Sequence, residues 1–479
     1  MCSFPWKLAA LNPEESAAVT SIALEGEISE EGLALVVECF PELETLDLSG
    51  FEGALPENAF AGMENLTTVT LPETDEIPAN MFAGCTSLQS VDIPASVNSI
   101  GEGAFKDCAT LQKIQLTGIS SIGDNAFSGC ENLMNITLLA DVAHASEATE
   151  RPARAARRVA VASKAFEGLN PNCFVILDQG VDVNANGVNF LRTSVGTVSE
   201  TMPDGTVEER EGRIYTAEND IHISSDAALA IPHAFTLADN ATISMETSHK
   251  DWSSLVVPFD VETITDAATG AALEITQLAP KTRMAKGNLL YTLAENGEAL
   301  ESVTEVKANV PYFFHTAEET NVVFSAKDVK VAATPAQISV EGKEFTLHAT
   351  YAPVEISADQ VYLLRADGAA FDPVASDEET VAIRPFEVYA TSPAALSYIE
   401  TELPYTDIST ELAEAILGEN GLKVAKEGSL LAVYAAEEMT LTLYTVDGAA
   451  VMTLDLLPGR NTVDLAPGLY ILNGLKFRF

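Results

Sequence analysis

The sequence predicts an α+β protein that is mostly β: an N-terminal solenoid of short repeats, one or more β-sandwich-like domains, and a small C-terminal β-sandwich. Three observations lead to this prediction. A repeat of 22 or 23 residues fills much of the first third of the chain. Short β-rich runs divided by turn residues follow the repeat, and a β-meander forms the C-terminal end of the chain. With 479 residues and 47% hydrophobic content, the chain can form several ordered cores.

The repeat appears in four segments that align without gaps: AFAGMENLTTVTLP, MFAGCTSLQSVDIP, AFKDCATLQKIQLT and AFSGCENLMNITLL. After each phenylalanine, the hydrophobic residues follow the L-x-x-L-x-L spacing of a leucine-rich repeat. One short strand per turn buries its inward side chains only against the next turn, so we expect the turns to stack into a continuous core. The aligned phenylalanines are Phe60, Phe82, Phe105 and Phe127.

Both ends of the repeat array are expected to differ from its interior. In SEEGLALVVECF, Ser29 is a candidate N-cap before a helical apolar pattern, which predicts a helix in the first turn. LNPNCFVILDQ is typical of a closing strand after Phe166. The predicted leucine-rich repeat solenoid covers residues 15–178, after an N-terminal segment at 1–14.

Three cysteines, Cys85, Cys108 and Cys130, occupy the same position in consecutive repeats. They could form a metal or disulfide ladder, or a buried column of small hydrophobic side chains. Equivalent side chains in stacked repeats point in parallel, and strand spacing holds Cβ atoms farther apart than a disulfide needs. We therefore expect a buried column.

The repeat unit A-F-x-G-C-x-x-L-x-x-I-x-L-P resembles the bacterial surface-antigen type of leucine-rich repeat, called BspA-like. The resemblance covers roughly residues 15 to 178. It implies an exported surface protein that binds host or community partners and is not an enzyme.

Residues 180–405 predict an all-β domain, which could contain two subdomains. Its segments Trp252–Val261, Ala308–Phe313 and Arg384–Tyr389 resemble segments common in β-domains that follow these repeats in surface proteins. The run DVNANGVN has the D-x-N-x-N-G order of a calcium loop, but Thr193 stands where a bidentate glutamate is expected, so calcium binding stays an open alternative. The candidate metal ligands are Asp182, Asn184 and Asn186.

No catalytic motif is present: the six histidines lack ligand spacing, and neither a G-x-S-x-G nor a phosphate-binding glycine motif occurs. Catalytic groups can lie far apart in sequence, so a hydrolase remains the weakest of three hypotheses.

Residues 421–479 predict the C-terminal β-sandwich, with hairpin turns at Asp447-Gly448 and Pro458-Gly459. Their order also resembles the C-terminal sorting domain of type IX secretion cargo. This resemblance implies export across the outer membrane of a Gram-negative bacterium, to the extracellular space or the outer-membrane surface. It rests on the Asp447-Gly448 turn, on Pro467, Gly468 and Tyr470, and on the final strand around Lys476.

The chain is strongly acidic, with 71 Asp and Glu against 26 Lys and Arg and a net charge of -45. Such a surface repels nucleic acid and anionic lipid. The absence of an 18-residue apolar run predicts no transmembrane helix, and the N-terminus lacks the pattern of a signal peptide.

One stretch is basic in an otherwise acidic chain and also interrupts the repeat. Phe127 and Phe166 are 39 residues apart, which predicts an insertion at about 140–157 containing RPARAARR. We expect a flexible, protease-sensitive loop that folds back on the acidic body, with docking of an anionic partner as the alternative. Its arginines are Arg151, Arg154, Arg157 and Arg158.

The leading hypothesis is binding of a host or bacterial surface protein by the outward face of the repeat strands, here called the polar ladder. Strand alternation places small polar side chains outward, and the lack of aromatic residues disfavours a glycan on this face. The alternative is a carbohydrate-binding or calcium-dependent β-module within residues 180–400; apart from calcium, we expect no cofactor. The polar ladder comprises Thr45, Asp47, Thr68, Thr70, Ser90, Asp92, Lys113, Gln115, Asn135 and Thr137.

Overall fold

A computed structural model of the chain divides into two compact units, residues 1–404 and 405–479. The described residues are mostly in strands, which confirms the predicted mostly β fold. The structure describes residues 18–140, 157–179, 181–183, 188–201, 207–278, 287–358, 361–364, 368, 370–374, 380–393, 399–401, 403, 416–417, 422–427, 430–435, 438–445, 450–465, 469–472 and 475–478.

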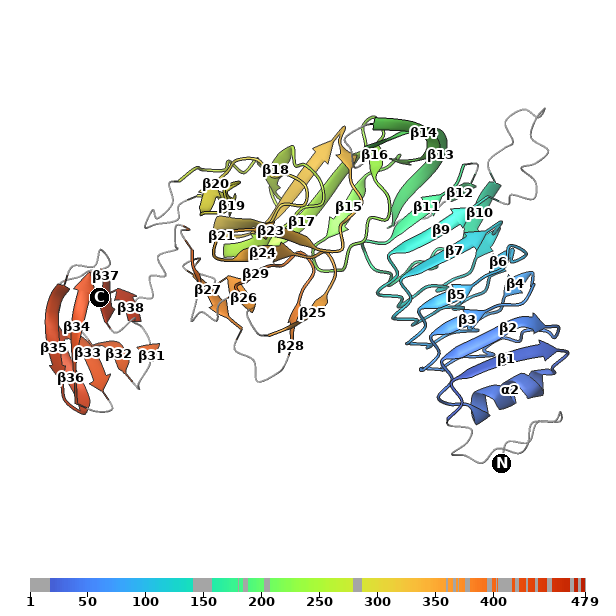
Figure 1. Cartoon of the computed structure of the whole chain (residues 1–479), viewed down its shortest axis with the longest axis horizontal. Coiled ribbons are helices and arrows are strands. Elements are labelled where there is room, and N and C mark those ends of the chain that lie inside the picture. Colours follow the sequence, from blue (N-terminus) through green and yellow to red (C-terminus); the bar gives the residue numbers. More distant parts are fainter. Residues whose placement is uncertain are drawn as a thin grey trace. The chain divides into compact units, whose positions relative to one another are not determined.

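The first unit begins with a solenoid whose coils each contribute strands to parallel sheets (Figure 1). On one side, two sheets contain β1 (Ser21–Gly26), β2 (Thr45–Phe51), β3 (Thr68–Thr70) and β5 (Ser90–Asp92), then β7 (Lys113–Thr117), β9 (Asn135–Leu139) and β11 (Phe174–Leu177). On the other side lie β4 (Glu76–Ile77), β6 (Ser99–Ile100), β8 (Ser121–Ile122), β10 (Arg157–Val161) and β12 (Val181–Val183).

The predicted helix at the start of the solenoid is confirmed as α2 (Glu30–Cys39). The Ser29 side chain accepts a hydrogen bond from the backbone N–H of Gly32 at 3.3 Å, as an N-cap does. Leu33 and Val36 are buried against the first coils, so the helix covers one end of the apolar core.

The solenoid sheet does not stop at residue 178. Strand β11 pairs in parallel with β13 (Asn189–Thr201), and the same sheet continues through β14 (Val207–Ala217), β16 (Phe235–Leu237) and β22 (Lys330–Val331). The solenoid and the following β-domain, defined here as β13 to β30, therefore share one sheet.

Two further six-stranded sheets build the rest of the β-domain, and they share one apolar core in which Phe313 meets Phe371 edge to face at 5.4 Å. The first contains β15 (Ile221–Ser224), β17 (Thr242–Leu255), β21 (Tyr312–Lys327), β19 (Leu289–Leu293) and β20 (Leu300–Ser302), with β18 (Thr263–Asp266) paired to β21. The second contains β23 (Ile338–Glu341), β24 (Thr346–Ala349), β29 (Val388–Thr391), β26 (Val361–Leu364), β27 (Ala370–Pro373) and β30 (Ile399–Glu400), beside the pair β25 (Val354–Ser357) and β28 (Thr380–Ile383).

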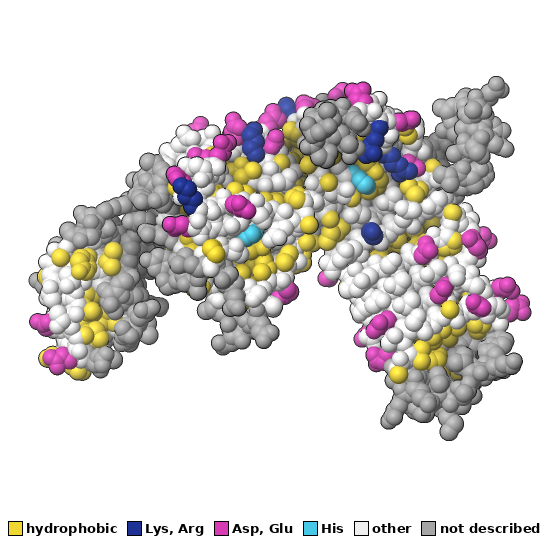
Figure 2. Space-filling view, viewed as in Figure 1, with side chains coloured by type: hydrophobic (Ala, Val, Ile, Leu, Met, Phe, Trp, Pro, Cys, Tyr) yellow, Lys and Arg dark blue, Asp and Glu magenta, His cyan; other side chains and the backbone are white. Residues whose placement is uncertain are grey.

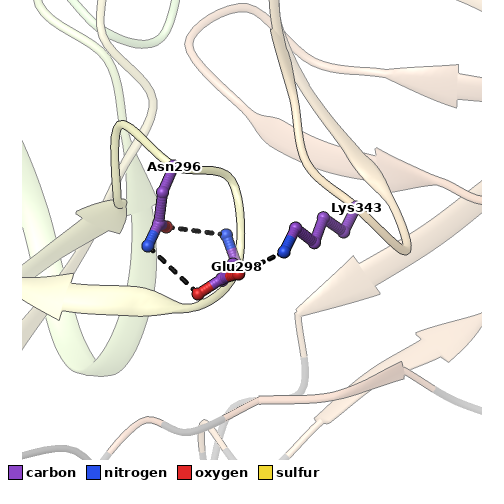
Figure 3. Close-up of polar contacts among 3 residues, drawn as sticks. All are labelled: Asn296, Glu298 and Lys343. Carbon is purple, nitrogen blue, oxygen red and sulfur yellow. Dashed lines mark hydrogen bonds and ion pairs between the residues drawn. The ribbon is translucent and has the colours of Figure 1, made fainter.

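A surface contact joins a turn before β20 to the turn after β23 (Figure 3). Asn296 and Glu298 bond to each other within the first turn, and the Glu298 carboxylate pairs with the ammonium of Lys343. Both charged side chains are more than half exposed, so this pair adds little stability.

The second unit contains two four-stranded antiparallel sheets around one apolar cluster that includes Leu443, Leu456 and Leu472. One sheet is formed by β31 (Ile416–Leu417), β32 (Lys423–Glu427), β33 (Leu430–Ala435) and β36 (Gly459–Asp464). The other is formed by β35 (Ala450–Leu456), β34 (Met439–Thr445), β37 (Leu469–Leu472) and β38 (Leu475–Arg478).

Candidate functional site

The polar ladder forms two rows of side chains on the outer face of the solenoid sheets. Thr45, Thr68 and Ser90 are directly paired across β2, β3 and β5, and Asp47, Thr70 and Asp92 form the second row. Strands β7 and β9 continue both rows, pairing Lys113 with Asn135 and Gln115 with Thr137. All ten side chains are exposed or half-buried.

Inward side chains hold these rows in place. The aligned phenylalanines stack on one another, with ring centroids 5.9 Å apart for Phe60 and Phe82, 5.6 Å for Phe82 and Phe105, and 5.5 Å for Phe105 and Phe127. The stack reaches Phe166 at 6.3 Å, so the insertion between Phe127 and Phe166 does not interrupt it. Each coil therefore positions the next at a fixed spacing.

The cysteine column is buried and unpaired, as predicted. The thiols of Cys85, Cys108 and Cys130 donate to the carbonyl oxygens of the phenylalanines one coil earlier, at 3.2, 3.2 and 3.0 Å. Burial raises the pKa of Cys85 and of Cys130 to about 12 and raises the pKa of Cys108 further, so all three stay protonated. Cys173 is also buried and free, and burial raises the pKa of its thiol.

The polar ladder ends at β11. Phe174 pairs with Asn135, and Ile176 pairs with Thr137, so apolar side chains take the two outward positions. Both are buried in the core of the β-domain, whereas Val175 and Leu177 of the same strand belong to the solenoid core. The β-domain therefore covers the outer face at this end and leaves it open over the earlier coils.

Two asparagines, Asn172 just before β11 and Asn189 at the start of β13, bind strand β15, which is the edge strand of its sheet. The Asn189 amide accepts from the N–H of His222 and donates to its carbonyl, both at 3.0 Å. The Asn172 amide does the same with Ser224, at 2.7 and 2.8 Å. Residues 222 and 224 face the same edge, so these amides occupy the hydrogen-bonding positions that another strand would fill.

A groove of about 1140 Å³, here called the junction groove, lies beside this attachment. Its polar lining comes from β15, β17 and β21 and includes His222, Ser244, Glu246 and Asn321. Its apolar lining comes from the end of the solenoid and the start of β13. The apolar lining consists of Leu177, Val183, Val188 and Phe190.

Carboxylates outnumber cations in the groove. Arg192 is paired with Glu218 at 2.9 Å, which leaves Asp220, Asp226 and Glu246 as the remaining lining charges. Asp220 accepts hydrogen bonds from the backbone N–H and hydroxyl of Thr242, and these hold its pKa below the usual range. On the face drawn in Figure 2, acidic side chains also outnumber basic ones among the coloured residues.

A buried histidine lies elsewhere on β17. His249 Nδ1 is 2.5 Å from the Ser253 hydroxyl, and its Nε2 contacts the Thr247 hydroxyl. His249 is 2% exposed, and burial lowers its pKa to about 4. The ring is buried, and in the part of the chain that the structure describes both of its nitrogens contact hydroxyl groups rather than a carboxylate. This arrangement is structural rather than that of a nucleophile and its base.

The other predicted site residues are only partly described. Asp182 lies in β12, where its backbone pairs with Arg158 of β10, while Asn184 and Asn186 lie outside the described residues. Within the described part of the chain, no group of three or more metal-ligating side chains gathers. Calcium binding therefore stays a prediction.

The basic segment is split in the same way. Arg151 and Arg154 lie outside the described residues, and Arg157 and Arg158 belong to strand β10 rather than to a loop. Strand pairing explains this difference, because β10 bonds to β8 on one side and to β12 on the other.

Sequence reasoning missed the junction groove. It is assembled from short segments near residues 177–192, 218–226, 244–248 and 321–323, which are far apart in the chain. The one local signal is the polar run Glu218–Asp226, which is rich in Ser, Asn and Asp, and such runs are also typical of ordinary turns.

Comparison with known proteins identifies the repeat. The family model for the BspA type leucine rich repeat region matches residues 53–149 in 6 copies. This part of the chain is therefore a BspA-type leucine-rich repeat region, as its sequence resemblance indicated. No curated protein matches the chain.

Three solved structures are similar to part of the chain. A leucine-rich repeat protein from Bacteroides ovatus is 22% identical over 35% of this chain and 42% of its own, with a TM-score of 0.23. A leucine rich repeat protein from T. pallidum is 17% identical over 36% and 72%, with a TM-score of 0.21. A leucine rich cell surface protein from Faecalibacterium prausnitzii is 23% identical over 31% and 50%, with a TM-score of 0.20. The chain thus spans less than half of the first of these proteins.

Among the described residues, no helix has both the length and the apolar character needed to cross a membrane.

Proposed function

We propose that this protein is a non-enzymatic binding protein of the bacterial surface whose polar ladder contacts a host or bacterial surface protein. The observation that carries the proposal is the open double row of polar side chains, held at fixed spacing by the stacked phenylalanines beneath it. A polar surface of small side chains without aromatic rings suits a protein partner better than a sugar.

Three charged side chains give the ladder a direction. Asp47 and Asp92 lie on the earlier coils, and Lys113 lies on a later one. Asp47 accepts from the backbone N–H of Ser49 at 2.9 Å, which lowers its pKa and keeps it ionised. A partner with the opposite order of charges would bind in one orientation.

The test is a pull-down from host-matrix and bacterial-surface extracts with the full chain as bait. In one variant, Thr68→Arg and Ser90→Arg place two large charged side chains on the ladder. The matched control, Ser99→Arg with Ser121→Arg, changes half-buried residues on the opposite sheet. The proposal expects a protein that the wild type and the control capture and the ladder variant loses; capture that is equal for all three contradicts it.

We also propose export to the surface of a Gram-negative bacterium, supported by the repeat type and by the resemblance of residues 421–479 to a sorting domain. The full chain and a form that ends at residue 420, each placed behind the same secretion signal peptide, would be expressed in a bacterium with type IX secretion. Surface detection of the full chain alone is expected; equal export of both forms contradicts this part of the proposal.

The competing function is a carbohydrate-binding or calcium-dependent β-module. The junction groove is the observation that favours its carbohydrate-binding form.

A further inference from the structure

We propose that the junction groove binds an uncharged oligosaccharide, independently of any partner of the polar ladder. The groove lies on the β-domain side of β11, beyond the point where the ladder ends. Its volume of about 1140 Å³ exceeds the usual range for one small molecule, so it fits a chain of several rings better than a single sugar.

The two kinds of lining in the groove match the two surfaces of a sugar ring. A pyranose presents an apolar C–H face and a rim of hydroxyl groups. Phe190 and Val188 in the apolar lining offer apolar contact, and an aromatic ring such as Phe190 packs well against C–H groups. The polar lining offers hydroxyl, amide and carboxylate groups for the rim.

Hydrogen bonds within the polar lining already orient its groups. His222 Nδ1 and the Ser244 hydroxyl are 2.9 Å apart, and the Asn321 amide donates to Glu246 Oε1 at 3.0 Å. These contacts fix the side-chain positions while Glu246, which is exposed, keeps lone pairs for a ligand. A sugar hydroxyl that donates to a carboxylate forms a charge-assisted hydrogen bond.

The charge of the groove selects among sugars. Among the described residues that line the groove, Arg192 is the only lysine or arginine beside Asp220, Asp226 and Glu246, and it pairs with Glu218. Uronic acids, sialic acids and phosphorylated sugars would be repelled at this site. Neutral hydroxyls meet no such repulsion.

The attachment of the solenoid also disfavours an extended peptide. A peptide commonly binds by adding a strand to a free sheet edge. The edge of β15 beside the groove is occupied by the amides of Asn172 and Asn189, so its N–H and C=O groups at residues 222 and 224 are already satisfied. The polar side chains of the groove are still available to bind a polyhydroxylated ligand.

The test uses the full chain on an array of neutral, amino-bearing and anionic oligosaccharides, in buffer containing EDTA, followed by calorimetric titration of the best neutral ligand. Two variants alter the groove: Phe190→Leu removes the ring and keeps an apolar side chain, and Glu246→Gln removes a charge from an exposed position. Each is expected to weaken binding at least tenfold. The ladder variant Thr68→Arg with Ser90→Arg is the control and should bind like the wild type.

Far-ultraviolet circular dichroism would check that each variant is folded. The proposal is overturned if the wild type binds no neutral oligosaccharide, if it binds only amino-bearing or anionic oligosaccharides, or if both groove variants bind as tightly as the wild type. Loss of binding in the ladder variant alone would also overturn the groove proposal, because it would show that the oligosaccharide binds at the polar ladder. If the ladder variant captures the same proteins as the wild type while the groove variants lose oligosaccharide binding, only the polar-ladder proposal is contradicted.

Discussion

The solenoid and the β-domain differ in how far apart in the sequence their contacting residues lie. In the solenoid, the Cys85 thiol reaches the Phe60 carbonyl 25 residues away, and similar separations recur in the next coils. In the β-domain, Ile231 bonds to Thr334 across 103 residues. The solenoid is thus stabilised by contacts between neighbouring coils, whereas the β-domain must close long loops before its pairings form.

The largest expected effect comes from breaking the phenylalanine stack. Phe105→Ala removes a fully buried ring between Phe82 and Phe127 and should lower the free energy of unfolding by about 3–5 kcal/mol, because it leaves a cavity. Urea denaturation measures the loss. Hydrogen exchange should quicken most in the adjacent coils; equal quickening on β17 and β21 would contradict a nearest-neighbour solenoid. Phe105→Leu is the milder control.

The next effect tests the connection between the two regions. Asn172 is fully buried, and Asn172→Ala would leave the N–H and C=O of Ser224 and the C=O of Ala227 without these hydrogen bonds. We expect a loss of about 3 kcal/mol. In the control Asn132→Ala, the lost bond joins one coil to the next, at 2.8 Å to Ala109, and about 1 kcal/mol is expected. Equal urea midpoints for the two variants would refute the attachment described for Asn172.

A third prediction concerns pH and the β-domain alone. Burial holds the pKa of His249 at about 4, below the value of 6.5 for an exposed histidine. As the pH falls from 6.5 towards 4, the unfolded chain takes up a proton at this position before the folded one does, so the folded state loses stability.

Between pH 7 and pH 5 this loss is about 2 kcal/mol. His249→Gln should remove that part of the pH dependence, as judged from urea midpoints at the two pH values. His222→Gln, which changes an exposed histidine, should retain it. An unchanged pH profile in His249→Gln would show that its burial is not the cause.

The smallest effect is expected at the surface contact between Glu298 and Lys343. Both side chains are largely exposed, so Lys343→Met should change the free energy of unfolding by less than about 1 kcal/mol. Calorimetry of the full chain measures the change. A larger loss of free energy of unfolding would mean that the contact between these two turns stabilises the β-domain more than its exposure indicates.

The comparison also explains what the sequence could predict. Features carried by neighbouring coils are periodic, so the phenylalanine stack, the cysteine column and the outward polar rows could be located from spacing alone. The Ser29 cap was equally local. The run Phe174–Leu177 is apolar at every position, which fits its burial on both faces, but nothing nearby indicated that a β-domain covers one of them.

The junction groove could not be predicted for the same reason. Phe190, Asp220, Glu246 and Asn321 are separated by tens of residues and come together only through the pairing of β15, β17 and β21. The amides of Asn172 and Asn189 were equally hidden, because asparagine in such a position is typical of a turn. Long-range pairing, rather than local pattern, decides this part of the molecule.

Strand β11 has a consequence for how such a chain can change over generations. Duplication or deletion of one 22- or 23-residue unit between Phe60 and Phe127 would add or remove one rung of outward side chains. Both ends of the array, α2 and the strand that enters the β-domain, would keep their own neighbours. Recombination between repeats can therefore lengthen or shorten the polar ladder without rebuilding the junction groove.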